Sequence, residues 1–532
     1  MVSCTTRTRT RARTLTRWVL HGELHDPHRE FFVEQRPVPL HKLWHERYVL
    51  VEAMLPCFVS AALGEQVLLV GKAINFIRLS CADSQWSLLT QKGADKPAAE
   101  AVASCASSLP PGCASSSGGS GSGGGSGGGG ASWLGELEYG QEEKLETFVR
   151  SAAARANARL LELLFGRYRL REHCAHIKSY LLLGKGDFVQ YLMEHLAPQL
   201  SRPSSQLHRH QLLSLVESAV RSCTAAAEGH SAEDTHELLL RHLDVALPKD
   251  PSSSGWDAFS LDYRVEPPVA EVLSAEAMAR YRKMFTFLWK LKRVEHALTS
   301  TWRKHGTAAH VLRLVRGDRS MHGCHLLRNE MIHFVYNLQY YLMFEVLECS
   351  WQTLLSELES ASDLDALLHA HTSFLDAIVQ KALLAPGDEP IYEALKAVFE
   401  AVLQFSKAQD TLYLQLLEQQ AAARQHASAV EANLRAGQWG DHGMPAHREP
   451  PPASLDPHFR QQLERHAVNY RRRFAEFFRL VSQHASLDLA FLSFRLDFNL
   501  FYETSQLQAE AAIADLSPDA SPVPGSPMPA TP

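Results

Sequence analysis

The sequence predicts an all-α fold in which a flexible linker rich in Gly and Ser joins two helical-bundle modules and a Pro-rich disordered tail ends the chain. Apolar residues recur at helical spacing, as in Leu160, Leu163, Leu164 and Tyr168 at i, i+3, i+4 and i+8. Alternating runs of β-branched residues, which would predict strands, are few. Residues 118–130 are almost pure Gly and Ser, and such a segment buries too little apolar surface to offset its ordering entropy.

The chain before this linker divides at residue 18. Residues 1–17 carry five Arg and no acidic residue and predict an Arg/Thr-rich unstructured start. Organellar transit peptides share that composition, but the segment lacks an amphipathic apolar stripe. We therefore expect either a segment that has no targeting function or a gene model whose start is wrongly assigned. Residues 18–91 mix short apolar runs with charged turns and form a small piece before the linker, and residues 92–132 form the Ala/Ser/Gly-rich linker.

Residues 133–507 predict a large helical module. Residues 330–349 are apolar on several faces, which predicts a helix at the centre of a bundle. Residues 393–424 and 457–484 predict two long helices with a loop between them. The many Pro near the end of the chain indicate that residues 508–532 are a disordered tail.

Composition excludes several classes of protein. The formal net charge of −6 over 532 residues argues against a protein that works by neutralising nucleic-acid phosphates. The mean hydropathy of −0.18 and the lack of an uncharged apolar run of about 18 residues argue against a membrane span. Nine scattered Cys without a Cys-x-x-Cys pair are typical of a reducing compartment rather than of a disulfide scaffold.

The motifs do not support a nucleotide or metal site. Gly71-Lys72 follows an apolar run as in a P-loop, but Gln66 replaces the first Gly and Ala73 replaces the Ser or Thr that holds magnesium. The closest groupings of the 27 His lack zinc-ligand spacing; they are His173 with His176, His322 and His325 with Cys324, and His369 with His371. Nothing in the motifs points to an enzyme or to a cofactor, and a metal-dependent enzyme is a remote alternative.

Basic residues lie beside aromatic residues at two places, Lys290 to Arg293 and Arg471 to Arg473. Nucleic-acid grooves also interleave basic and aromatic side chains. Because the net charge is negative, we favour two amphipathic helices, each with an aromatic core face and a solvated basic face. A basic face of this kind also suits an acidic protein partner.

Three stretches combine aromatic residues with Gly or charged residues: YLLLGKGDF at 180–188, GWDAFSLDY at 255–263 and FLSFRLDFN at 491–499. They indicate either tight packing of helix ends or a protein-binding surface rich in aromatics and Arg. In the first stretch we expect Asp187 to be the N-cap of the helix that follows.

In these stretches the chain resembles the gamma-tubulin complex component family, also called the spindle pole body component family. Two further segments share the likeness, FTFLWKLKRVEHAL at 285–298 and YYLMFEVLECSW at 340–351. Shorter runs between Trp18 and Ile77 resemble the end of that family's first helical module. The resemblance covers roughly residues 18–81 and 140–503.

The resemblance implies a scaffold without catalytic activity. In that family an N-terminal module packs side by side with neighbouring components, and a C-terminal module binds one gamma-tubulin. Residues 133–507 would then bind gamma-tubulin, and residues 18–91 would be a remnant of the lateral-contact module. The complex would nucleate microtubules at a microtubule-organising centre or spindle pole in the cytoplasm. Family members are usually longer at the N-terminus, so we expect impaired lateral contacts, in a gene-model fragment or a natural short form.

The residues predicted to contact gamma-tubulin lie in the aromatic and basic segments: Trp289, Lys290, Arg293, Arg495, Asp497, Phe498 and Asn499. The same residues would serve intramolecular packing under the other interpretation. The alternative class of protein is a helical scaffold of vesicle-tethering or ubiquitin-ligase type that does not bind tubulin.

Overall fold

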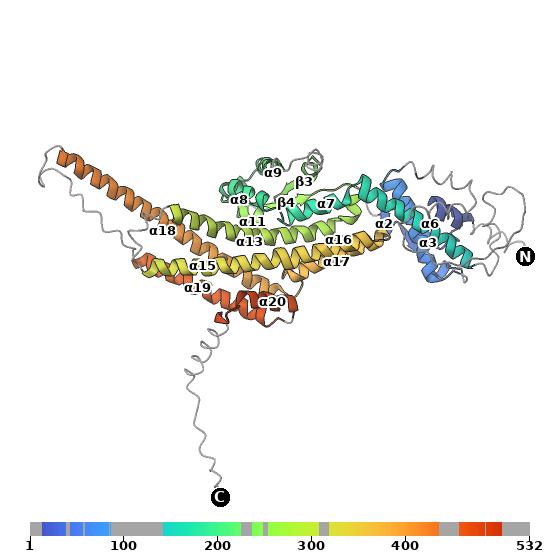
Figure 1. The fold of residues 1–532 in the computed structure, drawn as a ribbon. Helices are drawn as coiled ribbons and strands as arrows, with labels where there is room; N and C mark the ends of the chain where they lie inside the picture. The colour runs from blue at the N-terminus through green and yellow to red at the C-terminus, as the bar shows by residue number, and fades with distance from the viewer. Residues whose placement is uncertain are drawn as a thin grey trace, which may run out of the picture.

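The computed structural model describes residues 13–38, 43–56, 59–83, 86, 142–224, 237–247, 254–307, 319–435, 457–484 and 486–502. Helices dominate these residues and their strands form only two short pairs, which confirms the all-α class. The molecule is elongated, with the N-terminal helices at one end and a long bundle extending from them (Figure 1). The predicted linker at 92–132 and tail at 508–532 lie outside the described residues.

A buried Trp fixes the packing of the N-terminal helices. Trp18 lies in the helical segment 13–21 and is fully buried. Its indole Nε1–H donates to the Val67 carbonyl at 2.8 Å, on α3 (Ala61–Asn75). A Cβ at Gly71 of α3 would lie 1.8 Å from the indole, so only Gly permits this approach. The Gly71-Lys72 pair that follows an apolar run is therefore a site of helix packing.

Short elements complete this end of the molecule: β1 (Val33–Gln35), α2 (Leu43–Glu46), β2 (Tyr48–Leu50), η2 (Glu52–Met54) and the π-helix η3 (Phe76–Ser80). Strands β1 and β2 pair antiparallel. The long helix α6 (Glu142–Glu162) packs along α3 and continues through the π-helix η5 (Leu163–Arg167) toward the main bundle (Figure 1). Helix α6 therefore connects the N-terminal elements to the main bundle.

A layer of helices and one strand pair covers one side of the bundle (Figure 1). Its elements are α7 (Leu170–His176), η6 (Ile177–Leu181), α8 (Gly186–Leu200), η7 (Ser204–Gln206), α9 (Arg209–Thr224), β3 (Leu243–Ala246), α11 (Gly255–Ala258), β4 (Ser260–Tyr263) and α12 (Val269–Val272). Strands β3 and β4 pair antiparallel. The predicted N-cap at Asp187 is wrong, because Gly186 is already helical and Lys185 holds the cap position. Asp187 lies in the first turn, where its negative charge still favours the helix N-terminus.

The main bundle is built around α13 (Ala275–Thr307). This helix contacts α15, α17, α18 and β4, so several of its faces are buried. The other bundle elements are α15 (Arg319–Tyr340), η8 (Tyr341–Glu348), α16 (Cys349–Ser360), α17 (Leu364–Lys381), α18 (Glu389–Arg435), α19 (Pro457–Ser482) and α20 (Leu487–Leu496). The two predicted long helices are confirmed as α18 and α19, and α18 projects beyond the bundle (Figure 1).

Polar contacts connect the N-terminal elements to the rest of the molecule. The Trp44 Nε1–H donates to Asp365 Oδ1 at 2.6 Å, and the Trp44 backbone N–H donates to the Glu271 carboxylate. Burial raises the pKa of the Glu271 carboxyl to about 7, although the hydrogen bond from Trp44 opposes this shift. On α6, Arg159 pairs with the buried carboxylate of Asp83 at 2.9 Å. These contacts thus connect α2 to α12 and α17, and the segment after η3 to α6.

Gly71→Ala should destabilise the N-terminal end of the molecule, because the added methyl group overlaps the Trp18 indole. We expect a loss of about 1–3 kcal/mol, seen as a lower Tm in thermal unfolding followed by circular dichroism. Gly323→Ala on α15 is the matched control, because a Cβ there meets no atom within 4 Å and Ala favours helix more than Gly does. Equal Tm values for the two variants would contradict the packing role of Gly71.

Buried His371 should make the molecule less stable in mild acid. Its Nε2 lies 2.9 Å from the Tyr281 hydroxyl. Burial, assisted by the charge of Arg280, lowers the pKa of His371 from 6.5 to about 4. Between these two pH values the unfolded chain binds more protons than the folded one, so stability falls as the pH drops through this window.

The variant His371→Gln removes this titration and keeps a side chain that can hydrogen-bond to Tyr281. The drop in Tm between about pH 7 and about pH 5 should be smaller in this variant than in the unchanged protein. Part of the drop should persist, because burial also lowers the pKa values of His173 and His176 to about 4. An undiminished drop would show that His371 does not contribute.

Candidate functional site

Five exposed aromatic side chains and the half-buried Tyr340 form one surface where α15 and η8 meet α20. We call it the aromatic surface, and its members are Tyr336, Tyr340, Phe344, Phe491, Phe494 and Phe498. Tyr336 is 65% exposed, Phe494 60% and Phe498 71%, although large aromatic side chains are usually buried. Because contiguous exposed apolar side chains are typical of interaction sites, this surface is the candidate site.

Each of two chain segments places its own rings along one side. On α15 and η8 the rings follow at i, i+4 and i+8, and those of Tyr340 and Phe344 lie 4.7 Å apart. On α20 and the turn after it they follow at i, i+3 and i+7, and those of Phe494 and Phe498 lie 5.8 Å apart. Helical spacing therefore puts each set on one side of its helix.

Arg495 joins the two sets of rings. Its guanidinium carbon lies 3.8 Å from the centre of the Tyr340 ring and 5.8 Å from that of the Phe491 ring. A guanidinium over an aromatic face is attracted to it by about 0.5–2 kcal/mol, depending on how far the pair is desolvated. Arg495 therefore holds α20 on α15 and gives the aromatic surface a positive charge.

Buried contacts fix the chain that follows α20. The Asp497 side chain is buried, and both of its carboxylate oxygens accept the Tyr502 backbone N–H at 3.1 Å. The Tyr502 hydroxyl donates to Glu330 on α15 at 3.1 Å, and its ring centre lies 4.6 Å from that of Phe474 on α19. These contacts hold in place the turn that presents Phe498 to solvent.

The seven predicted contact residues fall into two separate groups, and the first lies on α13. Trp289 is buried, with its ring centre 5.0 Å from that of Phe259. Lys290 is half-buried. Arg293 lies over Trp256, with its guanidinium carbon 5.2 Å from the ring centre. This group packs α13 against α11 and β4, so Trp289 can serve a partner surface only by supporting its neighbours.

The second group, Arg495 with residues 497–499, borders the aromatic surface. Phe498 belongs to that surface, Asn499 is exposed beside it, and Arg495 crosses it, whereas the Asp497 side chain is buried. The structure therefore brings four of the seven residues together at one place. Their contacts with a partner stay a prediction.

Residues 330–349, predicted to form a helix at the centre of a bundle, are buried on one side and exposed on the other. Met331, Val335 and Leu338 are buried, but Tyr336 and Phe344 are exposed. The physical reason is that α13, α19 and α20 pack against α15 and leave one of its sides open. Two apolar stripes on one helix are the sequence signal for this arrangement, and the pattern does not say which stripe meets the core.

The other two unusual stretches serve the core. Tyr180 and Phe188 are buried with ring centres 4.9 Å apart, and Phe259 and Tyr263 are buried as well. Packing of helix ends therefore explains the stretches at 180–188 and 255–263. The stretch at 491–499 differs because its aromatic rings face solvent.

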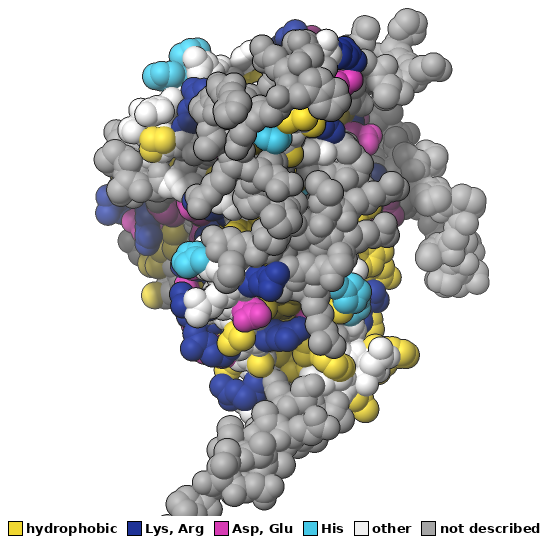
Figure 2. All heavy atoms as spheres, turned by 90° about the vertical axis from the view of Figure 1, so that its left-hand side faces the viewer, with side chains coloured by type: hydrophobic (Ala, Val, Ile, Leu, Met, Phe, Trp, Pro, Cys, Tyr) yellow, Lys and Arg dark blue, Asp and Glu magenta, His cyan; other side chains and the backbone are white. Residues whose placement is uncertain are grey.

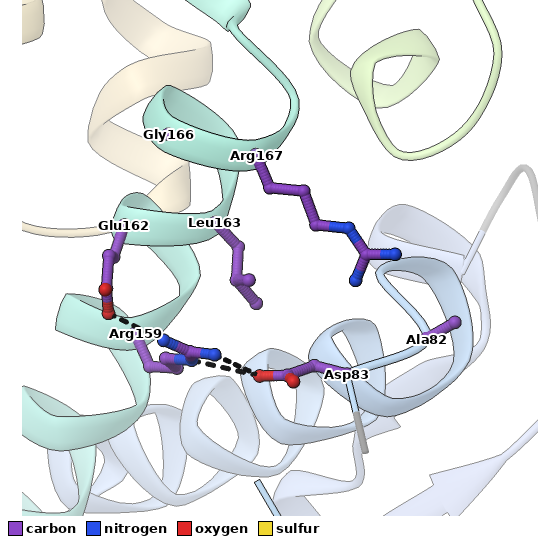
Figure 3. A pocket seen from close by; sticks show the side chains of 7 residues that line it. All are labelled: Ala82, Asp83, Arg159, Glu162, Leu163, Gly166 and Arg167. Carbon is purple, nitrogen blue, oxygen red and sulfur yellow. Dashed lines mark hydrogen bonds and ion pairs between the residues drawn. The ribbon is translucent and has the colours of Figure 1, made fainter. Parts of the chain in front are cut away.

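A hollow of about 450 Å³ lies between the end of η3 and the junction of α6 with η5 (Figure 3). Arg159 pairs with Asp83 and with Glu162, both at 2.9 Å, and Arg167 extends across the opening (Figure 3). The lining thus carries two acidic and two basic side chains. Because these charges balance, nothing in the lining selects an ion, and we assign no ligand to the hollow.

The paired His side chains in the described core act as hydrogen-bond partners of Tyr. His173 Nδ1 lies 2.7 Å from the Tyr263 hydroxyl, and His176 Nδ1 lies 3.4 Å from it. Within the described residues, no three His, Cys, Asp or Glu side chains are grouped closely enough to hold a metal ion.

None of the described helices is both long and apolar enough to cross a membrane.

The described residues thus form an elongated all-α bundle protein that exposes an aromatic surface. The family model described as "Gamma tubulin complex component C-terminal" matches residues 170–502, and the model described as "Gamma tubulin complex component N-terminal" matches residues 8–167. The chain therefore belongs to the gamma-tubulin complex component family. This membership confirms the resemblance and removes the vesicle-tethering or ubiquitin-ligase alternative.

Three curated relatives are similar along most of the chain. Gamma-tubulin complex component 3 of Arabidopsis thaliana is 37% identical over 91% of this chain and 54% of the relative. The homolog of Xenopus laevis is 36% identical over 92% of this chain and 51% of the relative. Gamma-tubulin complex component 3 of Homo sapiens is 34% identical over 92% of this chain and 51% of the relative. The chain spans about half the length of these relatives.

The two family models meet between residues 167 and 170, at the end of η5. The sequence predicts the division in the linker at 92–132 and a second module over residues 133–507. Helix α6 lies in the range of the N-terminal model and packs along α3. The predicted module boundaries stay a prediction.

Arg495→Ala should weaken the contact of α20 with α15. Because the guanidinium over the Tyr340 ring contributes about 0.5–2 kcal/mol, we expect the Tm to fall by a few degrees. Arg472→Ala on α19 is the control, because that side chain is exposed and its loss should leave the Tm almost unchanged. If the two variants melt together, Arg495 does not hold α20 in place.

Proposed function

We propose that this chain is a non-catalytic scaffold of a gamma-tubulin complex and that it binds gamma-tubulin through the aromatic surface. The exposed rings around Arg495 carry the proposal, and they lie in the range of the C-terminal family model. Aromatic side chains and Arg dominate the binding energy of protein interfaces. The relatives' name, gamma-tubulin complex component 3, indicates the partner.

The proposed role requires no bond-making or bond-breaking by this chain. Starting a microtubule is slow because each tubulin subunit that joins loses translational and rotational freedom. A rigid scaffold that holds several gamma-tubulins side by side raises the effective concentration of binding sites for the next subunits. In this proposal the bundle around α13 supplies the rigidity, and gamma-tubulin binds the nucleotide.

We also propose that the N-terminal helices contact other components of the complex laterally. The complex would act at a microtubule-organising centre or spindle pole, in the cytoplasm. The relatives named spindle pole body component, from Dictyostelium discoideum and Schizosaccharomyces pombe, support this location.

The seven predicted residues take different parts in this proposal. Arg495, Phe498 and Asn499 would contact gamma-tubulin directly, because their side chains lie at the aromatic surface. Asp497 would act by holding the turn that carries Phe498. The three residues on α13 form a second, half-buried group, for which we propose a contact only around Lys290 and Arg293.

The double variant Phe494→Ala/Phe498→Ala tests the proposal by co-sedimentation of the full chain with purified gamma-tubulin. Both side chains are mostly exposed, so folding should be unaffected. Loss of two central aromatic contacts should weaken binding at least tenfold, which corresponds to about 1.4 kcal/mol or more.

The control variant Trp302→Ala/Leu414→Ala removes two similarly exposed side chains from α13 and α18, and it should bind as the unchanged chain does. If the unchanged chain, folded by circular dichroism, does not bind gamma-tubulin, the proposed function is wrong. If it binds and the Phe494/Phe498 double variant binds equally well, the function stands and the aromatic surface is the wrong site.

A further inference from the structure

The outer face of α19 carries a row of Arg that the aromatic surface does not include. Arg465, Arg472 and Arg479 follow at intervals of seven residues, which is close to two turns of an α-helix. They therefore stand on one side of α19, about 10.5 Å from one to the next. All three are exposed, whereas Tyr470 and Phe477 on the opposite side are buried. We call this row the arginine stripe.

Positive charge is concentrated on this helix. The chain as a whole has a formal net charge of −6, but α19 contains six Arg and two Glu, with no Lys or Asp. Figure 2 views the molecule from the end at which α18 projects, and it shows Lys and Arg side chains beside hydrophobic ones on the lower part of that view. A local basic surface on an acidic chain attracts an anionic partner to that place.

None of the three Arg of the arginine stripe forms an ion pair with the described part of the chain. Arg479 donates to the uncharged side chain of Gln483 at 3.1 Å. For Arg465 and Arg472 the described residues provide no carboxylate within ion-pair distance. Of the two Glu on α19, Glu476 follows Arg472 by four residues and precedes Arg479 by three, so it stands on the same side of the helix, and it lies 3.8 Å from Arg473. The three guanidinium groups are therefore available to a partner.

The surroundings of the stripe indicate the backbone conformation of that partner. A packed partner helix would need a continuous row of apolar side chains along the stripe. Between Arg465 and Arg472 that side of α19 presents a single apolar side chain, Val468, which is 67% exposed. In an extended polyproline II segment, every third side chain lies on the same side, about 9.3 Å apart, and the backbone stays solvated. Long Arg side chains can match this spacing.

We propose that the arginine stripe binds an extended, acidic polypeptide segment of a partner protein that has Asp or Glu at every third position. Duplex nucleic acid carries about one charge per 1.7 Å along its axis and requires many phosphate contacts for affinity. A single row of three Arg on an acidic chain matches a sparse row of carboxylates better. This inference is independent of gamma-tubulin binding by the aromatic surface.

The experiment measures fluorescence anisotropy of labelled peptides with the full chain at about 50 mM salt. One peptide has four Glu-Pro-Pro repeats, and the other has the same composition with its four Glu in one block. We expect the repeat peptide to bind several-fold more tightly, and its binding to weaken about tenfold at higher salt because exposed ion pairs are screened.

The variant Arg465→Gln/Arg472→Gln/Arg479→Gln should bind the repeat peptide at least tenfold more weakly, with an unchanged Tm because the three side chains are exposed. The control Arg150→Gln/Arg155→Gln/Arg241→Gln makes the same change in net charge at exposed positions elsewhere and should bind normally. The triple Arg→Lys variant of the stripe should keep most of the affinity, because it keeps the charges.

Three results would overturn the proposal. The first is equal binding of the two peptides. The second is an equal loss of affinity for the repeat peptide in the stripe and control variants. Either result would mean that binding depends only on overall charge. The third is tighter binding of duplex DNA or of vesicles containing phosphatidylserine, lost in the stripe variant, which would assign the stripe to a nucleic acid or a membrane surface.

Discussion

The rest of the structure depends on the burial of α13 by elements on several of its sides. Large side chains of this helix, among them Tyr281, Phe285, Phe287 and Trp289, are almost completely removed from solvent, and each buried aromatic contributes several kcal/mol that would be lost with it. Covering them requires β4 and α11 on one side and α15, α17 and α18 on the others. Once α15 is placed against α13, its second apolar stripe has to face outward.

The aromatic surface is thus a consequence of how the core is covered. Arg495 and Tyr502 then fix α20 and the following turn against α15, so the exposed rings are held by charged and polar contacts that are partly buried. A surface prepared in this way loses little conformational freedom when a partner binds. The arginine stripe on α19 has the opposite chemistry, since it relies on charge and presents few apolar atoms. One face of the bundle could therefore bind a folded partner and another an extended acidic segment.

Several features that look functional in the sequence turn out to serve packing. Gly71 allows the approach of the Trp18 indole to α3, and His371 and His173 form hydrogen bonds with buried Tyr hydroxyls. Burial keeps these His side chains neutral near pH 7 by lowering their pKa values. A neutral imidazole can satisfy a buried hydroxyl at a smaller desolvation cost than a charged group.

The sequence by itself determined the helical class, the long helices α18 and α19, and the family, because helical periodicity and the order of motifs are properties of the linear chain. Only the tertiary structure decided which apolar residues face solvent. Trp289 and Phe498 lie in similar mixtures of aromatic and charged residues, yet the first is buried under α11 and β4 and the second is exposed beyond α20. The reason is that burial depends on elements distant in sequence, whose approach no local pattern records.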